Sequence, residues 1–291
     1  MINRATWERL DAVIEEYQRT AARHPEALAQ IALAELAESV QQSNAIENST
    51  LTLDDTERIL SGTMPAGRRQ LREVYEAKNL AAVTEDMLSS GDDLSLALIL
   101  RWHGMLLAGI RDDVAGRFRR GDEWVRVGSH LGANPAFVAD LVTEALARFQ
   151  ADRSMRPLEL IAWFHCEFET VHPFVDGNGR IGRVLINKQL QDIGWPPVIV
   201  RARNRQLDYY PQLEEYSKTG SHHGMTRLLV LLVLESLHKR ITLVTSRRVI
   251  ALADWARACG VSGASATNKA RRQTIPAFRL RDRWMIDADF G

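Results

Sequence analysis

Twelve consecutive residues, 172–183, combine side chains that suit the transfer of a phosphate-containing group. The run reads His-Pro-Phe-Val-Asp-Gly-Asn-Gly-Arg-Ile-Gly-Arg. His172 is a natural proton acceptor, because an unperturbed imidazole has a pKa of about 6.5. Asp176 is a carboxylate of the kind that Mg²⁺ binds together with water and phosphate oxygens. The run therefore offers a base and a metal ligand in one short segment.

The second half of the run predicts an anion-binding site. The glycine-flanked turn Gly177-Asn178-Gly179 opens into a helix predicted over about 179–191. The first turn of a helix leaves backbone N–H groups unpaired and carries partial positive charge, so it attracts phosphate. Arg180 and Arg183 stand three residues apart on one face of this helix, where they could form forked hydrogen bonds to phosphate oxygens.

This run resembles the signature of the Fic (Fic/Doc) family, His-Pro-Phe-x-(Asp/Glu)-Gly-Asn-Gly-Arg-x-x-Arg, with every defined position filled. The preceding segment, 162–171, is also similar to the family's usual approach to the motif. His165 and Glu169 in this segment are expected to be buried hydrogen-bonding residues rather than catalysts. The resemblance covers roughly residues 30–225. It implies a helical Fic fold whose members typically transfer AMP from ATP to a Ser, Thr or Tyr hydroxyl of a target protein.

The resemblance also implies a role for each polar residue of the run. His172 would take the proton from the attacking hydroxyl, and Asp176 would hold Mg²⁺ on the α- and β-phosphates of ATP. The turn at 177–179 would bind the phosphates. Arg180 and Arg183 would stabilise the charge that builds on the leaving pyrophosphate.

Residues 116–135 differ from their surroundings, because four glycines punctuate them and 123–127 have strand propensity. They predict an exposed hairpin, or flap. The resemblance implies that this flap pairs with an extended target segment by strand addition. It also implies that Phe174 anchors the loop in the core. Tyr209 and Tyr210 resemble the aromatic positions beside the adenine pocket, and core packing explains one of them equally well. The flap residues concerned are Trp124, Val125, Arg126 and Val127.

A second motif stands upstream, where Ser43-Asn-Ala-Ile-Glu47-Asn48 matches the (Ser/Thr)-x-x-x-Glu-(Gly/Asn) inhibitory motif of Fic proteins. A Glu47–Arg183 pair would remove the guanidinium meant for the γ-phosphate and put a carboxylate where phosphate should lie. We therefore expect an autoinhibited chain of the subclass whose inhibitory helix precedes the core. In some relatives the same glutamate positions water for removing AMP. Removal of AMP, or transfer of another nucleotidyl or phosphoryl group on the same scaffold, stays an alternative.

Hydrophobic periodicity predicts a mainly helical chain. A loop is expected at 61–67 from its Gly and Pro content, and Asp92 and Asp93 are expected to cap the helix that follows them. We expect an N-terminal helical region at 1–90, a Fic core at 91–238 and a further domain at 239–291. The predicted body helices are 7–18, 26–42, 53–60, 70–89, 94–107, 135–149, 157–170, 179–191, 209–217 and 225–244.

The last segment is basic: residues 239–291 hold 11 Lys and Arg against 4 Asp and Glu, although the whole chain has zero net charge. Helices predicted around 249–258 and 264–273, followed by a short hairpin turning at 281–282, are similar to a winged helix-turn-helix. Asn268, Lys269, Arg271 and Arg272 could contact DNA. A protein-binding or dimer-supporting role is the equal alternative, and a DNA-binding regulator that uses the core as a nucleotide sensor is a third.

Composition is that of a soluble globular protein, with 45% hydrophobic and 25% charged residues. The apolar runs are too short to span a bilayer, and the N-terminus is amphipathic rather than a signal sequence. The two cysteines, Cys166 and Cys259, have no CxxC spacing. We expect a cytoplasmic protein with Mg²⁺ and ATP as its small partners, no membrane partner, and a homodimer as one open oligomeric state.

Overall fold

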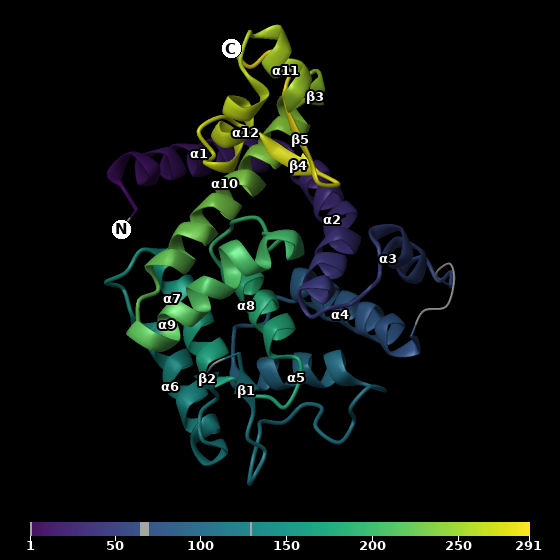
Figure 1. Cartoon of the computed structure of the whole chain (residues 1–291), viewed down its shortest axis with the longest axis vertical. Helices are drawn as coiled ribbons and strands as arrows, with labels where there is room; N and C mark the ends of the chain where they lie inside the picture. Colours follow the sequence, from purple (N-terminus) through teal and green to yellow (C-terminus); the bar gives the residue numbers. More distant parts are fainter. Residues whose placement is uncertain (1, 65–69, 129) are drawn as a thin grey trace. The chain divides into compact units, whose positions relative to one another are not determined.

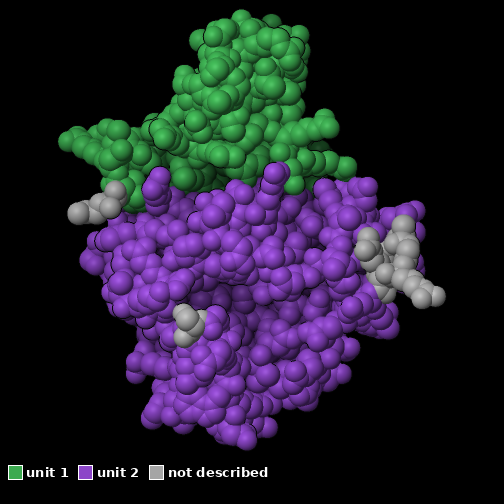
Figure 2. Space-filling model, viewed as in Figure 1, with its two compact units in different colours: residues 1–35, 195–198, 229–291 green, residues 36–194, 199–228 purple. Residues whose placement is uncertain are grey.

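The computed structural model describes residues 2–64, 70–128 and 130–291. It is mainly helical, as the sequence predicts, with little β-sheet (Figure 1). The chain forms two compact units. One contains residues 1–35, 195–198 and 229–291, and the other contains residues 36–194 and 199–228 (Figure 2). Within the described residues, none of the helices combines the length and the apolar character needed to cross a membrane.

The larger unit, residues 36–194 and 199–228, contains the twelve-residue run and is arranged around helix α8. Helix α7 packs against α6, α8 and α9, and α4 packs against α3, α5 and α8. Because α8 has neighbours on several sides, even its polar Asn187 and Gln189 are buried. The elements are the end of α2 (Pro25–Ile46), α3 (Leu53–Leu60), α4 (Leu71–Ser89), α5 (Leu96–Leu107), α6 (Val138–Ala151), α7 (Pro157–Val171), α8 (Asn178–Asp192), α9 (Tyr210–Thr219) and the start of α10 (His223–Thr245).

Capping explains where these helices begin. Helix α3 has the predicted bounds, because Thr52 and Asp55 form a capping box at its start. The cap predicted at Asp92 and Asp93 is wrong: α5 begins at Leu96, and the side chain of Ser95 accepts the N–H of Leu98. Of the loop predicted at 61–67, residues 65–67 lie outside the described residues. Short 3₁₀ turns at Pro135–Phe137 and Ala202–Asn204 and a π-helical turn at Arg205–Tyr209 complete the unit.

The predicted flap is a hairpin with a very short ladder. Strand β1 (Arg126–Val127) pairs antiparallel with β2 (His130–Leu131), in the register Arg126↔Leu131 and Val127↔His130. Ser129, between the strands, lies outside the described residues. The side chain of Trp124 is 49% exposed, so it precedes the ladder as a surface residue. The hairpin is confirmed, although it is shorter than the strand propensity of 123–127 predicts.

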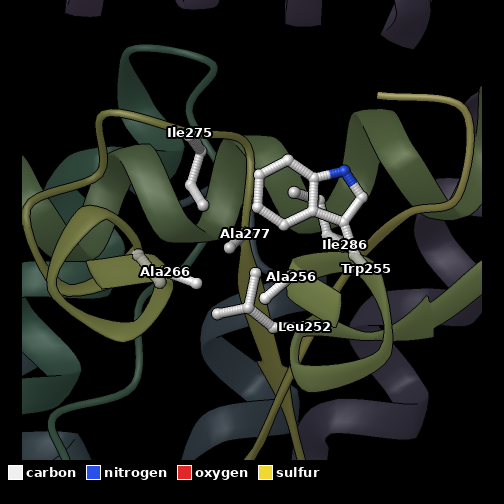
Figure 3. Packing of buried hydrophobic residues seen from close by; sticks show 8 residues of the cluster. Leu252, Trp255, Ala256, Ala266, Ile275, Ala277 and Ile286 are labelled. Carbon is white, nitrogen blue, oxygen red and sulfur yellow. The ribbon is translucent and has the colours of Figure 1, made fainter. Parts of the chain in front are cut away.

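The smaller unit contains α1 (Arg4–Arg23), most of α10 and the C-terminal segment. That segment folds as β3 (Val249–Ala251), α11 (Leu252–Ala258), α12 (Gly263–Arg271), β4 (Phe278–Leu280) and β5 (Arg283–Asp287), with sheet order β3-β5-β4. The helix predicted from 249 is wrong in its first turn, because 249–251 pair with β5. Figure 3 shows the small core between the helices and the sheet. Its members are Leu252, Trp255, Ala256, Ala266, Ala270, Ile275, Ala277 and Ile286.

Candidate active site

His172 lies where α7 ends and the loop to α8 begins. It caps α7 through a 2.9 Å hydrogen bond from its N–H to the carbonyl of Phe168. Its backbone is left-handed, with φ 52° and ψ 64°, a region that few non-glycine residues adopt. Such a conformation persists only where the surroundings enforce it. The surrounding structure therefore holds His172 in a strained backbone conformation, which fixes the position of its side chain.

The loop that follows is held by its own side chains. Asn178 accepts the N–H of Phe174 and donates to the Phe174 carbonyl, both at 2.8 Å. The fully buried Phe174 ring stacks on His103 at 3.6 Å, as expected of a core anchor. His103 Nδ1 accepts the N–H of Gly116, so its Nε2 donates to the carbonyl of Asp176, 3.0 Å away. Sequence reasoning missed His103, because a single buried histidine has no recognisable pattern.

The imidazole of His172 is neutral near pH 7. Its Nδ1 lies 3.3 Å from the carbonyl oxygen of Glu169. A carbonyl only accepts, so the proton lies on Nδ1 and the lone pair of Nε2 stays available. Burial lowers the pKa of His172 to about 4. The side chain therefore has the protonation state that a proton acceptor requires.

Arg183 is bound by the upstream segment 43–48, which the sequence predicts to be inhibitory. Its Nε donates to Ser43 Oγ, and its Nη2 donates to the Ser43 carbonyl and to Glu47 Oε1, all at 2.9 Å. Burial acts to lower the pKa of Arg183, but Glu47, Tyr209 and Glu169 together raise that pKa above its ordinary value. The two segments, 136 residues apart in sequence, therefore form a charged contact in the folded chain.

The Glu47 carboxylate also lies against the glycine turn. A Cβ atom at Gly179 would collide with Glu47 Oε1 and would lie 3.0 Å from Nη1 of Arg183. Gly177, with φ 84°, needs the freedom of glycine for a different reason, since it is the left-handed residue before α8. The anion-binding turn predicted at 177–179 therefore has a carboxylate beside it in this structure.

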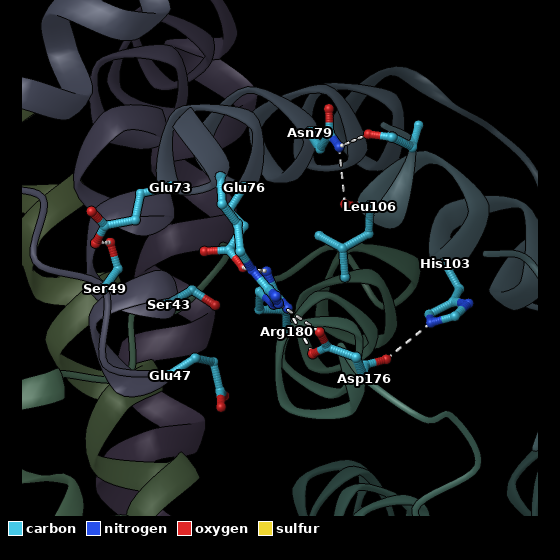
Figure 4. A network of polar contacts seen from close by, with 12 residues as sticks. Ser43, Glu47, Ser49, Glu73, Glu76, Asn79, His103, Leu106, Asp176 and Arg180 are labelled. Atoms are coloured by element: carbon cyan, nitrogen blue, oxygen red, sulfur yellow. Dashed lines mark hydrogen bonds and ion pairs between the residues drawn. The ribbon is translucent and has the colours of Figure 1, made fainter. Parts of the chain in front are cut away.

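Contacts on two sides fix the segment that carries Glu47. Asn48, itself left-handed with φ 69°, accepts a 3.0 Å hydrogen bond from Arg205. The hydroxyl of Tyr210 donates to the carbonyl of the last residue of α2 at 3.0 Å. On the other side, Glu73 of α4 accepts hydrogen bonds from residues 49–50 (Figure 4). The position of Glu47 is thus set by two groups of contacts from distant parts of the sequence.

Asp176 and Arg180 belong to a ring of alternating charges with α4 (Figure 4). Asp176 binds Arg72 at 2.8 Å and Arg180 at 3.1 Å. Glu76 binds the same two arginines at 3.0 and 3.4 Å. Arg180 is thus paired with acidic residues here, whereas Arg183 contacts the inhibitory motif. The two arginines predicted to share a helix face have separate partners.

The Asp176 carboxyl fits the expected Mg²⁺. Burial acts to raise its pKa, but Arg180, Arg72 and the N–H of Gly177 together hold that pKa below its ordinary value, so the group is ionised. The described residues contain no group of three or more His, Cys, Asp or Glu side chains placed to enclose a metal. Mg²⁺ is commonly held by one or two carboxylates together with substrate phosphates, and a single aspartate suffices for that mode.

Removing Arg72 is expected to tighten divalent-metal binding a few-fold. Its guanidinium lies 2.8 Å from Asp176 Oδ2, where it competes with a cation, but the Arg72 side chain is 51% exposed. Such half-exposed pairs contribute at most about 1 kcal/mol. Mn²⁺ titrations followed by electron paramagnetic resonance would compare wild type, Arg72→Ala and Asp176→Asn. Equal Mn²⁺ affinity in wild type and Arg72→Ala would contradict the competition, and Asp176→Asn should abolish binding at this position.

Tyr209 and the buried residues of α7 form a polar cluster beneath the site. The Tyr209 hydroxyl lies 2.8 Å from His165 Nε2, and both side chains are almost fully buried. Glu169 is 7% exposed, and burial raises its pKa to about 8. Its Oε1 has no hydrogen-bond partner among the described residues. His165 is buried and hydrogen-bonded as expected, while Glu169 is buried with one oxygen unsatisfied.

A cavity of about 770 Å³ brings several predicted residues together. His172, Gly179, Arg183 and Glu47 line it, together with Asn48, Tyr209 and Tyr210. Of the flap residues, Arg126 and Val127 line the cavity, whereas Trp124 and Val125 do not. Asp176, Gly177, Asn178 and Arg180 are also absent from its lining. His172, Gly179 and the Glu47 carboxylate therefore share one space, and Asp176, the predicted metal ligand, lies outside it.

Known proteins provide an independent comparison. Residues 93–190 match the model of the Fic/DOC family. The protein adenylyltransferase Fic of Culex quinquefasciatus is 30% identical over 60% of this chain, and that of Nematostella vectensis is 29% identical over 69%. The matches span 36% and 47% of those proteins' own lengths. A solved structure of Fic-1 (residues 134–508) from C. elegans is 26% identical, with a TM-score of 0.72 over 82% of this chain and 72% of that one. Residues 93–190 of this chain therefore form a domain of the Fic/DOC family.

Proposed function

We propose that this chain is a protein adenylyltransferase that Glu47 holds in an inhibited state. One observation carries the proposal: Arg183, the last arginine of the Fic motif, bonds to Ser43 and Glu47, and the Glu47 carboxylate lies against Gly179. The adenylyltransferase names of the relatives support AMP as the transferred group. The same residues would bind the nucleotide's phosphates once Glu47 withdraws.

The chemical step uses His172 as the base. Nε2 of His172 takes the proton from a Ser, Thr or Tyr hydroxyl of the target while the hydroxyl oxygen attacks the α-phosphorus of ATP. A bond forms between that oxygen and the α-phosphorus, and the bond from the α-phosphorus to the bridging oxygen of the β-phosphate breaks. Pyrophosphate leaves with the electron pair. The low pKa of His172 keeps the base free at neutral pH.

The start of α8 holds the phosphates. The first backbone N–H groups of α8, from Asn178 onward, have no partners within the helix and point toward an incoming anion. The side chain of Asn178 is occupied with Phe174, so its contribution is its backbone N–H. Arg183 would bind the far phosphates with forked hydrogen bonds. Mg²⁺ held by Asp176 would neutralise charge on the phosphate oxygens.

The flap would hold the target. Arg126 and Val127 line the cavity beside His172, and a short edge strand at this position suits strand addition by an extended target segment. Main-chain hydrogen bonds of this kind tolerate many sequences. The flap would therefore place a hydroxyl near Nε2 without strict selection of the neighbouring side chains.

The position of the radioactive label tests the proposal directly. The Glu47→Gly variant should transfer label to protein from α-³²P ATP but not from γ-³²P ATP, because AMP transfer retains only the α-phosphate. A cell extract supplies candidate targets, and α-labelled GTP and UTP test the base. Label from γ-³²P ATP would mean phosphoryl transfer, and no label from any nucleotide would contradict the proposal.

The pH dependence of transfer follows from the histidine. The acid limb of the pH–rate profile is expected well below pH 6.5, because burial lowers the pKa of His172 to about 4. The Glu47 carboxylate acts to raise that pKa, so its removal cannot move the limb upward. Initial rates for Glu47→Gly between about pH 5 and 8 should therefore show no acid limb near pH 6.5, with thermal unfolding at each pH as the control for stability. A limb at or above pH 6.5 would contradict the assignment.

Removal of AMP is a second candidate reaction. Glu47 lines the same cavity as His172, and its side chain is 40% exposed, so its carboxylate could orient a water molecule there. Release of AMP from a modified target by the wild-type chain, and its loss in Glu47→Gly, would distinguish this reaction from simple inhibition.

The C-terminal segment supports DNA as a further partner. Helix α12 follows α11 after a short turn and exposes Asn268, Lys269, Arg271 and Arg272. The exposed Arg281 and Arg283 belong to the hairpin formed by β4 and β5. Two helices joined by a turn, with cations on the second, are typical of DNA-binding modules.

Replacing Lys269, Arg271 and Arg272 together by alanine is therefore expected to weaken binding to a mixed-sequence DNA duplex. The log–log dependence of affinity on salt should become shallower by up to about 3, since each phosphate contact contributes about 0.9. Fluorescence anisotropy of the full chain would measure both. Alanine replacement of Arg4, Arg19 and Arg23 removes the same charge from α1 and should change the slope less. Equal effects would indicate attraction by net charge alone.

A further inference from the structure

Arg119 is a deeply buried arginine whose side chain donates hydrogen bonds to four backbone carbonyl oxygens of the described residues. It is 2% exposed. Its guanidinium donates to the carbonyls of Val171 and His172 at 3.0 and 2.6 Å, and to those of Glu123 and Ala133 at 3.0 and 2.7 Å. Buried arginines ordinarily pair with carboxylates. Arg119 instead connects backbone carbonyls of two separate segments.

The four carbonyls come from two parts of the chain. Val171 is the last residue of α7, and His172, which follows it, is the strained residue whose imidazole is the proposed base. Glu123 and Ala133 flank the β1–β2 hairpin at the tip of the flap, one before β1 and the other after β2. The backbone of Arg119 bonds to the same loop, because its N–H donates to the carbonyl of Pro173 at 2.9 Å.

The same neighbourhood is tightly packed. A Cβ atom at Gly132, in the flap, would lie 3.1 Å from Arg119 Nη2 and 3.3 Å from the Cβ of His172. The N–H of Ala133 donates to the carbonyl of Val171 at 3.2 Å. A movement of the segment on either side of the β1–β2 hairpin would therefore displace the backbone that orients the imidazole. Only the planar fork of an arginine reaches all four carbonyls at once.

We propose that Arg119 is a positioning residue that couples the flap to the base, so that docking of a target strand and the orientation of His172 depend on one guanidinium. The inference rests on the proposed function, because it assigns the flap to the target and His172 to the proton. Arg119 itself touches neither the nucleotide turn at 177–179 nor Arg183 in the contacts described above.

Arg119→Lys in the Glu47→Gly background tests the coupling. We expect AMP transfer to fall by about tenfold or more, because small displacements of a base are costly, while ATP affinity changes by less than about twofold. In ¹³C-histidine spectra, the His172 resonance, assigned with His172→Asn, should shift. Exchange of the Ala133 amide should accelerate in the same variant. The neighbouring Arg120→Lys makes the same substitution on an exposed side chain and should change none of these.

Accelerated exchange at Ala133 with an unchanged His172 resonance would overturn the coupling and leave Arg119 a support of the flap alone. If Arg119→Lys fails to fold, Glu123→Ala tests the same link from the flap end. It removes the bonds that Arg117 donates to the Glu123 carboxylate at 2.7 and 2.8 Å and keeps Arg119. It should shift the His172 resonance in the same direction, and no shift would again overturn the proposal. The spectra need no nucleotide, so they decide the coupling even if Glu47→Gly transfers no AMP.

Discussion

Replacing Glu47 by glycine is expected to raise the rate of AMP transfer by about tenfold to about a hundredfold. The change removes the carboxylate that bonds to Arg183 at 2.9 Å and lies against Gly179. The upper value corresponds to a charge-assisted hydrogen bond of about 3 kcal/mol. The lower value allows for solvent, because the side chain of Glu47 is 40% exposed. Transfer from α-³²P ATP to protein measures the rate.

Two matched variants distinguish the effect of losing the Glu47 carboxylate from the effect of placing a glycine in the backbone. Glu47→Gln keeps the length and shape of the side chain and removes its charge, so it should release part of the inhibition. Glu26→Gly places the same glycine in the first turn of α2, far along the helix from the motif, and should leave the rate unchanged. Equal rates in wild type and Glu47→Gly would show that Glu47 does not inhibit the transfer.

Removing the base is expected to lower transfer by about a hundredfold to about ten-thousandfold, the usual contribution of a positioned general base. The backbone decides the choice of variant. His172 is left-handed, and alanine is strained in that region, whereas asparagine tolerates it and has no basic nitrogen. His172→Asn is therefore the sharper substitution, and His172→Ala is its companion.

ATP binding distinguishes lost chemistry from a damaged site. His172 is not part of the predicted phosphate turn, so the ATP dissociation constant of Glu47→Gly should stay within about threefold when His172 is replaced, less than 1 kcal/mol. Isothermal titration calorimetry measures the ATP dissociation constant, and single-turnover labelling measures the rate of AMP transfer. Full transfer by the Glu47→Gly, His172→Asn double variant would require another base.

The chemistry of the site could be predicted because it is concentrated in neighbouring residues. One uninterrupted run contains His172, the glycine turn and both arginines, and backbone continuity alone keeps them within reach of one another. The upstream Glu47 was predictable only through the inhibitory motif. Its contact with Arg183 is one of long sequence separation, which periodicity does not encode.

Other residues gave no signal for a physical reason. Arg119 binds backbone carbonyls, which every residue has, so no complementary side chain marks its partners. His103 acts through a ring stack and two backbone bonds. The start of α5 was misplaced because acidic residues at 92–93 and Ser95 are all good caps, and packing of the helix decides between them.

The bonds between Asn178 and Phe174 have a consequence for how nucleotide binding would be measured. The loop is ordered by its own side chains and by a buried ring, so its entropy is lost when the chain folds rather than when a ligand arrives. A phosphate group at the start of α8 would therefore meet a preformed turn, and the change that it requires is the withdrawal of the Glu47 carboxylate from Gly179. The affinity for nucleotide would then report the release of Glu47 rather than the ordering of the loop.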